Sequence, residues 1–135
     1  RARCHRALQA MTDVAHTGDR PAYLERSFEF HVSVVGLSGH ARLEEAYRSL
    51  QLQLMLSMAL NRRAREEHET LDGDVARHTH LLEIIDTGDP EAVLDELATH
   101  GDRSFLDGIE DTVDGHTDVA LAWLAQQRTS RKETR

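Results

Sequence analysis

Several residue types are scarce in this sequence, and their scarcity excludes whole classes of protein. Its 135 residues include one cysteine, two prolines and only 4% aromatic residues. The single cysteine, Cys4, excludes a disulfide within the chain, so a reducing cytoplasm is the expected compartment. There is no apolar run of about 18 residues and no signal-peptide pattern at the start, so no membrane span is expected.

The chain also lacks a basic stripe. Its formal net charge is −8, and the arginines are scattered except in residues 128–135, which we expect to form a disordered basic tail. An acidic domain of this kind should not follow a phosphate backbone unaided. If the whole protein binds DNA, another segment must do so.

Motifs of the common enzyme classes are missing as well. The sequence has no glycine-rich phosphate loop, no nucleophile elbow and no HExxH motif, and its glycines stand singly. An enzyme is therefore not expected.

The composition favours helices. Hydrophobic residues make up 39% of the chain, and alanine, leucine, glutamate and arginine dominate while β-branched runs are few. We predict an all-α fold. The hydrophobic periodicity and the single glycines predict helices over residues 3–17, 19–37, 41–63, 74–87, from 90 past 100, and 119–127, the fifth either continuing or breaking near Gly108.

Three further expectations concern these segments. Residues 41–63 are apolar nearly all round, so they should lie at the centre of a bundle or at a subunit interface. Residues 62–73 are strongly charged and are expected to form a frayed helix end and a loop. Asp72 or Asp74 is expected to cap the helix that follows.

Nine histidines are present, and three of them have a distinctive position. His31, His78 and His100 each fall on the apolar stripe of a separate predicted helix, while most of the others are expected at the surface. If the three rings converge, they can hold a borderline divalent metal. If they do not, each is an isolated core histidine bonded to a neighbour or to water. Spacing alone leaves both readings open.

The order of two motifs carries a resemblance. The first is the stretch 23–31, which ends in Phe30-His31, followed by Ser38-Gly39-His40. The second is the stretch 78–92, with Gly88-Asp89-Pro90, followed by His100. Together they resemble the FadR-type C-terminal (FCD) domain of GntR-family transcription regulators, over roughly residues 3–105.

The resemblance implies an antiparallel bundle of about five to seven helices. Residues 1–127 would then be an effector-binding and dimerisation domain without its first helix or helices. A winged helix-turn-helix, absent from this chain, would precede it and bind DNA. The family implies a homodimer, a small carboxylate or hydroxy acid as effector, and in many members Zn, Ni or Mn held by one Asp and three His.

Carried over to this sequence, the three histidine ligands are His31, His78 and His100, and the aspartate position is Ser27. A neutral hydroxyl is a poor ligand for a divalent cation, so metal binding should be weaker than in the family, with Zn or Ni expected before Mn. Water or the effector's carboxylate can fill the position, Glu96 can replace the aspartate, or the pocket can bind an organic ligand without metal.

We therefore expect an effector pocket that contains Ser27 and the three histidines, walled by the 41–63 segment. Arg48, or alternatively Arg42, would reach an effector carboxylate. One alternative is a plain dimerisation or partner-binding bundle, in which the space around the histidines is filled. Another is a metal-dependent hydrolase, which needs a general base that the inner stripes scarcely offer.

Overall fold

The computed structural model describes residues 1–101, 106, 109–111 and 114–133. Within these residues the chain forms seven α-helices and no strand, which confirms the predicted all-α fold. The helices are α1 (Ala2–Ala15), α2 (Arg20–Val35), α3 (Ala41–Ser49), α4 (Gln51–Arg65), α5 (Leu71–Thr87), α6 (Pro90–His100) and α7 (Asp118–Glu133), with short 3-10 turns at Gly36–Ser38 and Ile109–Asp111.

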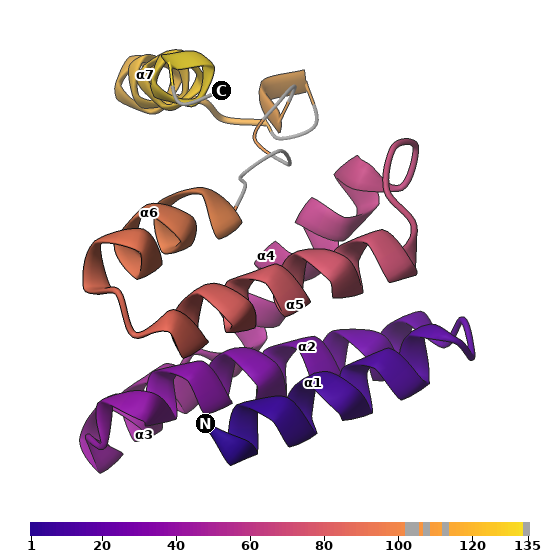
Figure 1. The fold of residues 1–135 in the computed structure, drawn as a ribbon. Helices are drawn as coiled ribbons and strands as arrows, with labels where there is room; N and C mark the ends of the chain where they lie inside the picture. The colour runs from indigo at the N-terminus through magenta and orange to yellow at the C-terminus, as the bar shows by residue number, and fades with distance from the viewer. Residues whose placement is uncertain (102–105, 107–108, 112–113, 134–135) are drawn as a thin grey trace.

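The helices are arranged around α2. Figure 1 shows α1 and α2 side by side, α5 above them in nearly the same direction, α6 beside α5, and α7 at the end of the molecule farthest from α1. Helix α2 contacts α1, α3 and α4, and α5 contacts α1 and α6. The functional groups discussed below therefore come from helices that meet around α2 and α5.

Helix starts and ends follow local chemistry. Asp19 and Asp89 accept hydrogen bonds from the backbone amides of Ala22 and Ala92, at 3.0 and 3.4 Å, so they are the N-caps of α2 and α6. Gly88 ends α5 in the left-handed region at φ 76°, which favours glycine. The cap of α5 differs from the prediction.

Thr70 caps α5, and not Asp72 or Asp74. The Thr70 hydroxyl accepts a hydrogen bond from the amide of Gly73 at 3.1 Å. Asp72 and Asp74 lie inside the first turn, where a carboxylate is favoured by the helix dipole. Helix α5 therefore begins earlier than expected, and Asp74 is left free to bond other groups.

The hydrophobic core lies between α1, α2 and α5. Met11 and Ala15 lie one turn apart on α1 and are buried. They pack in one cluster with residues of α2 and α5. That cluster comprises Cys4, Met11, Ala15, Tyr23, Phe30, Leu81, Leu82 and Ile85. On another side of α2, the ring of Phe28 stacks on Tyr47 of α3, with ring centroids 5.8 Å apart.

The central helix is α2. Residues 41–63 were expected at the centre of the bundle or at a subunit interface, and the first of these alternatives is wrong. That segment is two helices, separated at Leu50, whose backbone has φ −94° and ψ 13°. No residue of α3 or α4 is buried. Helix α4 packs on α2 with one side only, so Leu52 and Leu56 on its other side are 81% and 62% exposed.

The C-terminal part also differs from the expectation. Helix α6 ends at His100, and Gly108 lies outside the described residues. Helix α7 continues to Glu133, so the predicted disordered tail is helical as far as that residue. The Arg128 guanidinium pairs with Glu110 and donates to the carbonyl of Leu106 at 2.8 Å, which ties α7 to the preceding segment.

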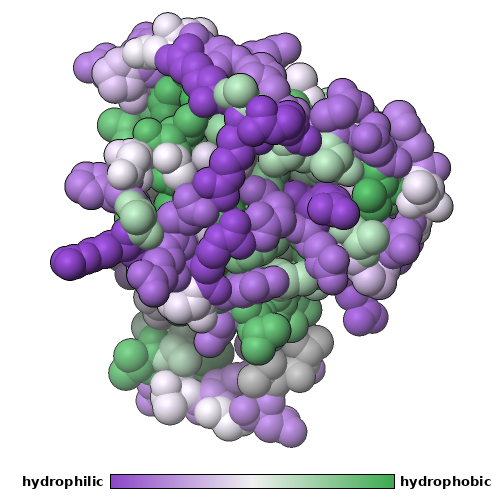
Figure 2. Space-filling view, turned by 90° about the horizontal axis from the view of Figure 1, so that it is seen from below, coloured by the Kyte–Doolittle hydropathy of each residue, from purple (hydrophilic) through white to green (hydrophobic). Residues whose placement is uncertain are grey.

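The face seen from below in Figure 2 is mostly hydrophilic, and hydrophobic residues appear on it only in separate patches. None of the helices in the described ranges combines the length and the apolar character that crossing a membrane requires.

The core assignment predicts that Phe30→Ala lowers the free energy of unfolding by about 3–5 kcal/mol, because a fully buried ring leaves a cavity. Chemical denaturation followed by circular dichroism measures this. Leu94→Ala, at a side chain that is exposed on α6, serves as the control and should change stability by less than about 0.5 kcal/mol. Equal effects of the two substitutions would contradict this core.

Candidate metal and ligand site

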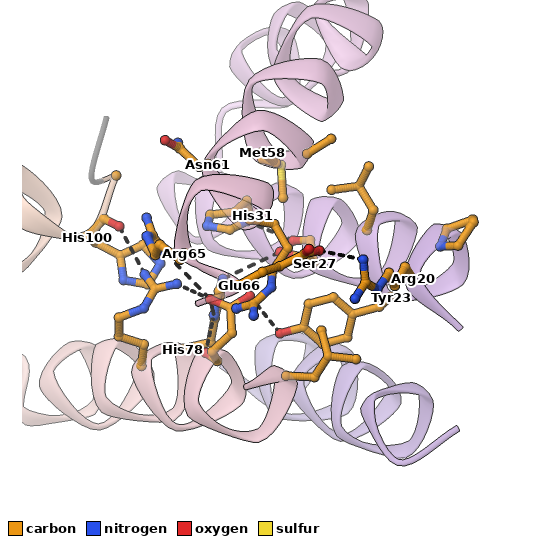
Figure 3. Close-up of a pocket in the computed structure, with 18 residues that line it drawn as sticks. Arg20, Tyr23, Ser27, His31, Met58, Asn61, Arg65, Glu66, His78 and His100 are labelled. Atoms are coloured by element: carbon orange, nitrogen blue, oxygen red, sulfur yellow. Dashed lines mark hydrogen bonds and ion pairs between the residues drawn. The ribbon is translucent and has the colours of Figure 1, made fainter. Parts of the chain in front are cut away.

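Three histidine rings converge from three helices. His31 belongs to α2, His78 to α5, and His100 is the last residue of α6. Their ring centroids lie 5.0 Å (31–78), 5.5 Å (31–100) and 4.8 Å (78–100) apart. One nitrogen from each ring can be chosen so that all three lie within 4.8 Å of one another. The structure thus brings together the three histidines that the sequence singled out (Figure 3).

Two of the rings are held in a defined orientation. Nδ1 of His31 lies 2.7 Å from the carbonyl oxygen of Ser27, and Nδ1 of His78 lies 2.7 Å from that of Asp74. A carbonyl oxygen only accepts hydrogen bonds, so each Nδ1 must carry the proton. Nε2 of both rings then carries a lone pair, and that of His78 lies 3.5 Å from the hydroxyl oxygen of Ser27. This is the arrangement typical of histidines that bind a metal.

The third ring has a carboxylate beside it. Nδ1 of His100 lies 3.6 Å from Glu96 Oε1, and the other oxygen of Glu96 lies 3.6 Å from Nε2 of the exposed His80. Glu96 is therefore on the Nδ1 side of the His100 ring, and it is not among the residues that line the cavity. At 3.6 Å the Glu96 carboxylate is too far for a hydrogen bond, and among the described residues Nδ1 of His100 has no hydrogen-bond partner.

The three rings are neutral. Burial lowers the pKa of His31 and lowers that of His78 well below its ordinary value. The pKa of His100 falls to about 3, first through burial and then through the neighbouring His31 and the positive charges of Arg77 and Arg65. A metal binds the deprotonated imidazole, so these rings are ready to bind one at neutral pH.

A cavity of about 410 Å³ adjoins the histidines. It lies between α2, α4, α5 and the end of α6, so α4 forms one wall, as expected for the 41–63 segment. Its lining residues come from all four elements. They are Arg20, Pro21, Tyr23, Leu24, Ser27, His31, Met58, Ala59, Asn61, Arg62, Arg65, Glu66, Leu71, Asp74, Arg77, His78, His100 and Gly101.

Arginines line this cavity, and sequence reasoning missed them. Arg62 and Arg65 are in the last turns of α4, and Arg77 is in α5. Nε of Arg77 donates to Glu69 at 2.9 Å, and Arg62 lies 3.2 Å from the same carboxylate. Arg77 also pairs with Asp74.

Helical spacing offers a signal for part of this set. The charged segment 62–73 was expected to begin as a frayed helix end, but α4 remains helical to Arg65. Met58, Arg62 and Arg65 are then spaced i, i+4, i+7 and share one side of α4. No comparable signal points to Arg77, because only the packing of α5 brings it to the cavity.

The two remaining predicted residues fall in different places. Ser27 is 4% exposed and lines the cavity, with its Oγ 3.5 Å from Nε2 of His78. Arg48 lies outside the cavity. Its guanidinium donates two hydrogen bonds to Glu29, at 2.8 and 3.0 Å, and one to Glu44 at 3.4 Å. The structure thus places Ser27 at the site and Arg48 in a separate ion-pair group.

The residues present fit a divalent transition metal. Three neutral imidazoles, two of them with an unprotonated Nε2, match the nitrogen ligands that zinc and nickel prefer. In a tetrahedral zinc site with Zn–N distances of about 2.0–2.1 Å, the ligand nitrogens are roughly 3.3 Å apart. The three ring nitrogens, now within 4.8 Å of one another, would reach this separation by movements on the order of an ångström.

Comparison with known proteins agrees with this architecture. The family model of the FCD domain matches residues 1–103. The chain is 30% identical over 100 residues to a protein of Paenarthrobacter nicotinovorans named as a probable D-xylose utilization operon transcriptional repressor. The matched segment covers 74% of this chain and 42% of that protein. The chain thus spans less than half the length of that relative. No solved structure gives a significant match.

Both matches are to regulatory proteins, and neither is to an enzyme. The family model matches 103 of the 135 residues, and this match agrees with the resemblance found in the sequence motifs. The chain therefore belongs to the FCD domain family, and it is similar to part of a transcriptional repressor.

Proposed function

We propose that this domain senses a small carboxylate-containing effector in the cavity, through a divalent metal held by His31, His78 and His100. The convergence of three neutral imidazoles at the wall of a cavity also lined by arginines is the observation that carries this proposal. The metal would supply a Lewis-acidic binding point for an effector oxygen. Arginine side chains suit the recognition of a carboxylate.

The presence of the cavity argues against the alternative of a dimerisation bundle without a ligand. That alternative requires filled space around the three histidines, whereas a cavity of about 410 Å³ adjoins them. The relative's name refers to D-xylose utilization, so D-xylose belongs in an effector screen beside small carboxylates.

We further propose that the domain forms a homodimer through the exposed leucines of α3 and α4. Leu52, Leu56 and Leu60 recur at i, i+4, i+8 on one side of α4 and are 81%, 62% and 38% exposed. Leu43 and Leu50 extend this exposed set onto α3 and its junction with α4. Exposed apolar patches of this kind mark interaction sites.

A second copy of the chain is the occupant that best fits the proposed role. A regulator that binds two-fold symmetric operator half-sites does so as a dimer. In the whole protein, a separate segment would bind the DNA, in the cytoplasm.

Helix α4 would connect the effector to the dimer. Met58 and Arg62 face the cavity, and Leu56 and Leu60 lie on the opposite side of the same helix. An effector that favours one position of α4 would therefore favour one arrangement of the two subunits.

The metal assignment predicts that the purified chain, after incubation with Zn or Ni and removal of free metal, retains about one equivalent per chain. His78→Ala combined with His100→Ala should abolish this, because one imidazole remains. Elemental analysis measures it. The double variant His16→Ala/His116→Ala removes two exposed histidines and should retain the metal. If the unaltered chain retains no metal, the metal assignment is wrong and the site is a metal-free pocket.

The dimer assignment predicts that the chain sediments as a dimer, and that Leu52→Glu/Leu56→Glu converts it to a monomer, because four buried carboxylates would meet at the interface. Analytical ultracentrifugation measures the state. The matched variant Leu94→Glu/Leu97→Glu places the same charges on exposed leucines of α6 and should stay dimeric. Dissociation caused by the α6 pair, and not by the α4 pair, would place the interface elsewhere.

A further inference from the structure

One ring of the histidine triad lacks the contact that orients the other two. In His31 and His78, Nδ1 lies 2.7 Å from the backbone carbonyl oxygen of the residue four positions earlier. His100 is only 8% exposed, and among the described residues its Nδ1 has no hydrogen-bond partner. Leaving a buried polar atom without a partner is costly. His100 is thus the ring of the triad whose orientation the backbone does not fix.

The residue four positions before His100 is Glu96, and its side chain lies beside the ring. Oε1 of Glu96 is 3.6 Å from Nδ1 of His100, one helical turn away, and its other oxygen is 3.6 Å from Nε2 of His80. The Glu96 side chain is 18% exposed. A hydrogen bond between a carboxylate and an imidazole spans about 2.8 Å, so the gap to His100 is on the order of an ångström too long.

Glu96 is not placed to bind a metal itself. The group of described residues able to hold a metal consists of the three histidines, and Glu96 does not line the cavity. It approaches His100 from the Nδ1 side of the ring. A ring whose Nδ1–H is bound to an acceptor presents Nε2 to a metal, as the rings of His31 and His78 do.

A metal on Nε2 of His100 would favour closure of this gap. The metal draws electron density from the imidazole, so Nδ1–H becomes a stronger donor toward a carboxylate. The interaction is also stronger at a partly buried position than in water. The side chain of Glu96 has three rotatable bonds, so small torsional changes are enough to bring its carboxylate to the ring.

We propose that Glu96 is a positioning residue of the metal site, whose carboxylate accepts a hydrogen bond from Nδ1–H of His100 when a divalent metal is bound at Nε2. This inference rests on the proposed function. Glu96 would then act on the metal from behind the ring of His100, and it would not replace the family's aspartate as a ligand. Removing a partner of this kind typically weakens metal binding about 10- to 100-fold.

Two variants at Glu96 and one control separate the contributions. Glu96→Met nearly keeps the length of the side chain but removes the charge and both oxygens. Glu96→Gln keeps the size and one oxygen that can accept the hydrogen bond, and removes only the charge. Asp95→Asn makes the same change of charge at the exposed neighbouring position of α6. Circular dichroism would verify that all three are folded.

The experiment measures the Zn affinity of each chain by competition with a chromophoric chelator. We expect Glu96→Met to bind Zn at least about tenfold more weakly than the unaltered chain, and Glu96→Gln to recover part of this loss. Asp95→Asn should change the affinity by less than about twofold, because exposed charges contribute little.

Nitrogen NMR of isotope-labelled histidines gives a second readout, which a merely structural role of Glu96 would not produce. In the Zn-loaded unaltered chain, we expect His100 to carry its proton on Nδ1 and the metal on Nε2.

The outcomes separate this inference from the proposed function. If the unaltered chain binds Zn but Glu96→Met weakens binding by less than about threefold, Glu96 is not a positioning residue and the metal site stands. Binding of Zn through Nδ1 of His100 leads to the same conclusion, because Glu96 would then face no donor. If the unaltered chain binds no Zn, the proposed metal-dependent function fails together with this inference.

Discussion

A buried imidazole needs a partner for each of its two nitrogens, and the way in which the chain meets this requirement shapes the whole site. His31 and His78 give one nitrogen each to a backbone carbonyl one helical turn earlier, at 2.7 Å. The regular backbone of α2 and α5 therefore fixes these rings and leaves Nε2 of each available. The packing of α2 and α5 around the common core then determines where the two nitrogens meet.

The same packing explains how the pocket can communicate with a partner. Helix α2 is buried on several sides and anchors the histidine site, whereas α4 rests on α2 with one side only. A helix held in this way can shift more easily than a core helix, because fewer buried contacts oppose the movement. Its cavity side carries Met58 and Arg62, and its outer side carries the exposed leucines, so a shift caused by a ligand would reach the proposed interface.

Most of the helices and the three histidines of the site were predictable from the sequence, whereas the arginines of the cavity were not. Helix starts at Asp19 and Asp89 were predictable because capping is local chemistry, whereas the cap of α5 was misplaced because Thr70 and Asp72 are both good capping residues. The three histidines were found through apolar stripes and family motifs. Arg77 was not, because only tertiary packing brings it to the cavity. Segment 41–63 is apolar nearly all round, but burial depends on neighbours, and α4 packs on α2 and borders the cavity with one side while its other side stays exposed.

The central claim is that His31, His78 and His100 together hold one metal ion. Anomalous diffraction from crystals grown with Zn or Ni, recorded at the edge of that metal, tests it most directly. The account predicts one strong peak bounded by a nitrogen of each ring, at about 2.0–2.2 Å. A peak elsewhere, or a triad with no peak and its rings bonded only to protein or to an organic molecule, would contradict it.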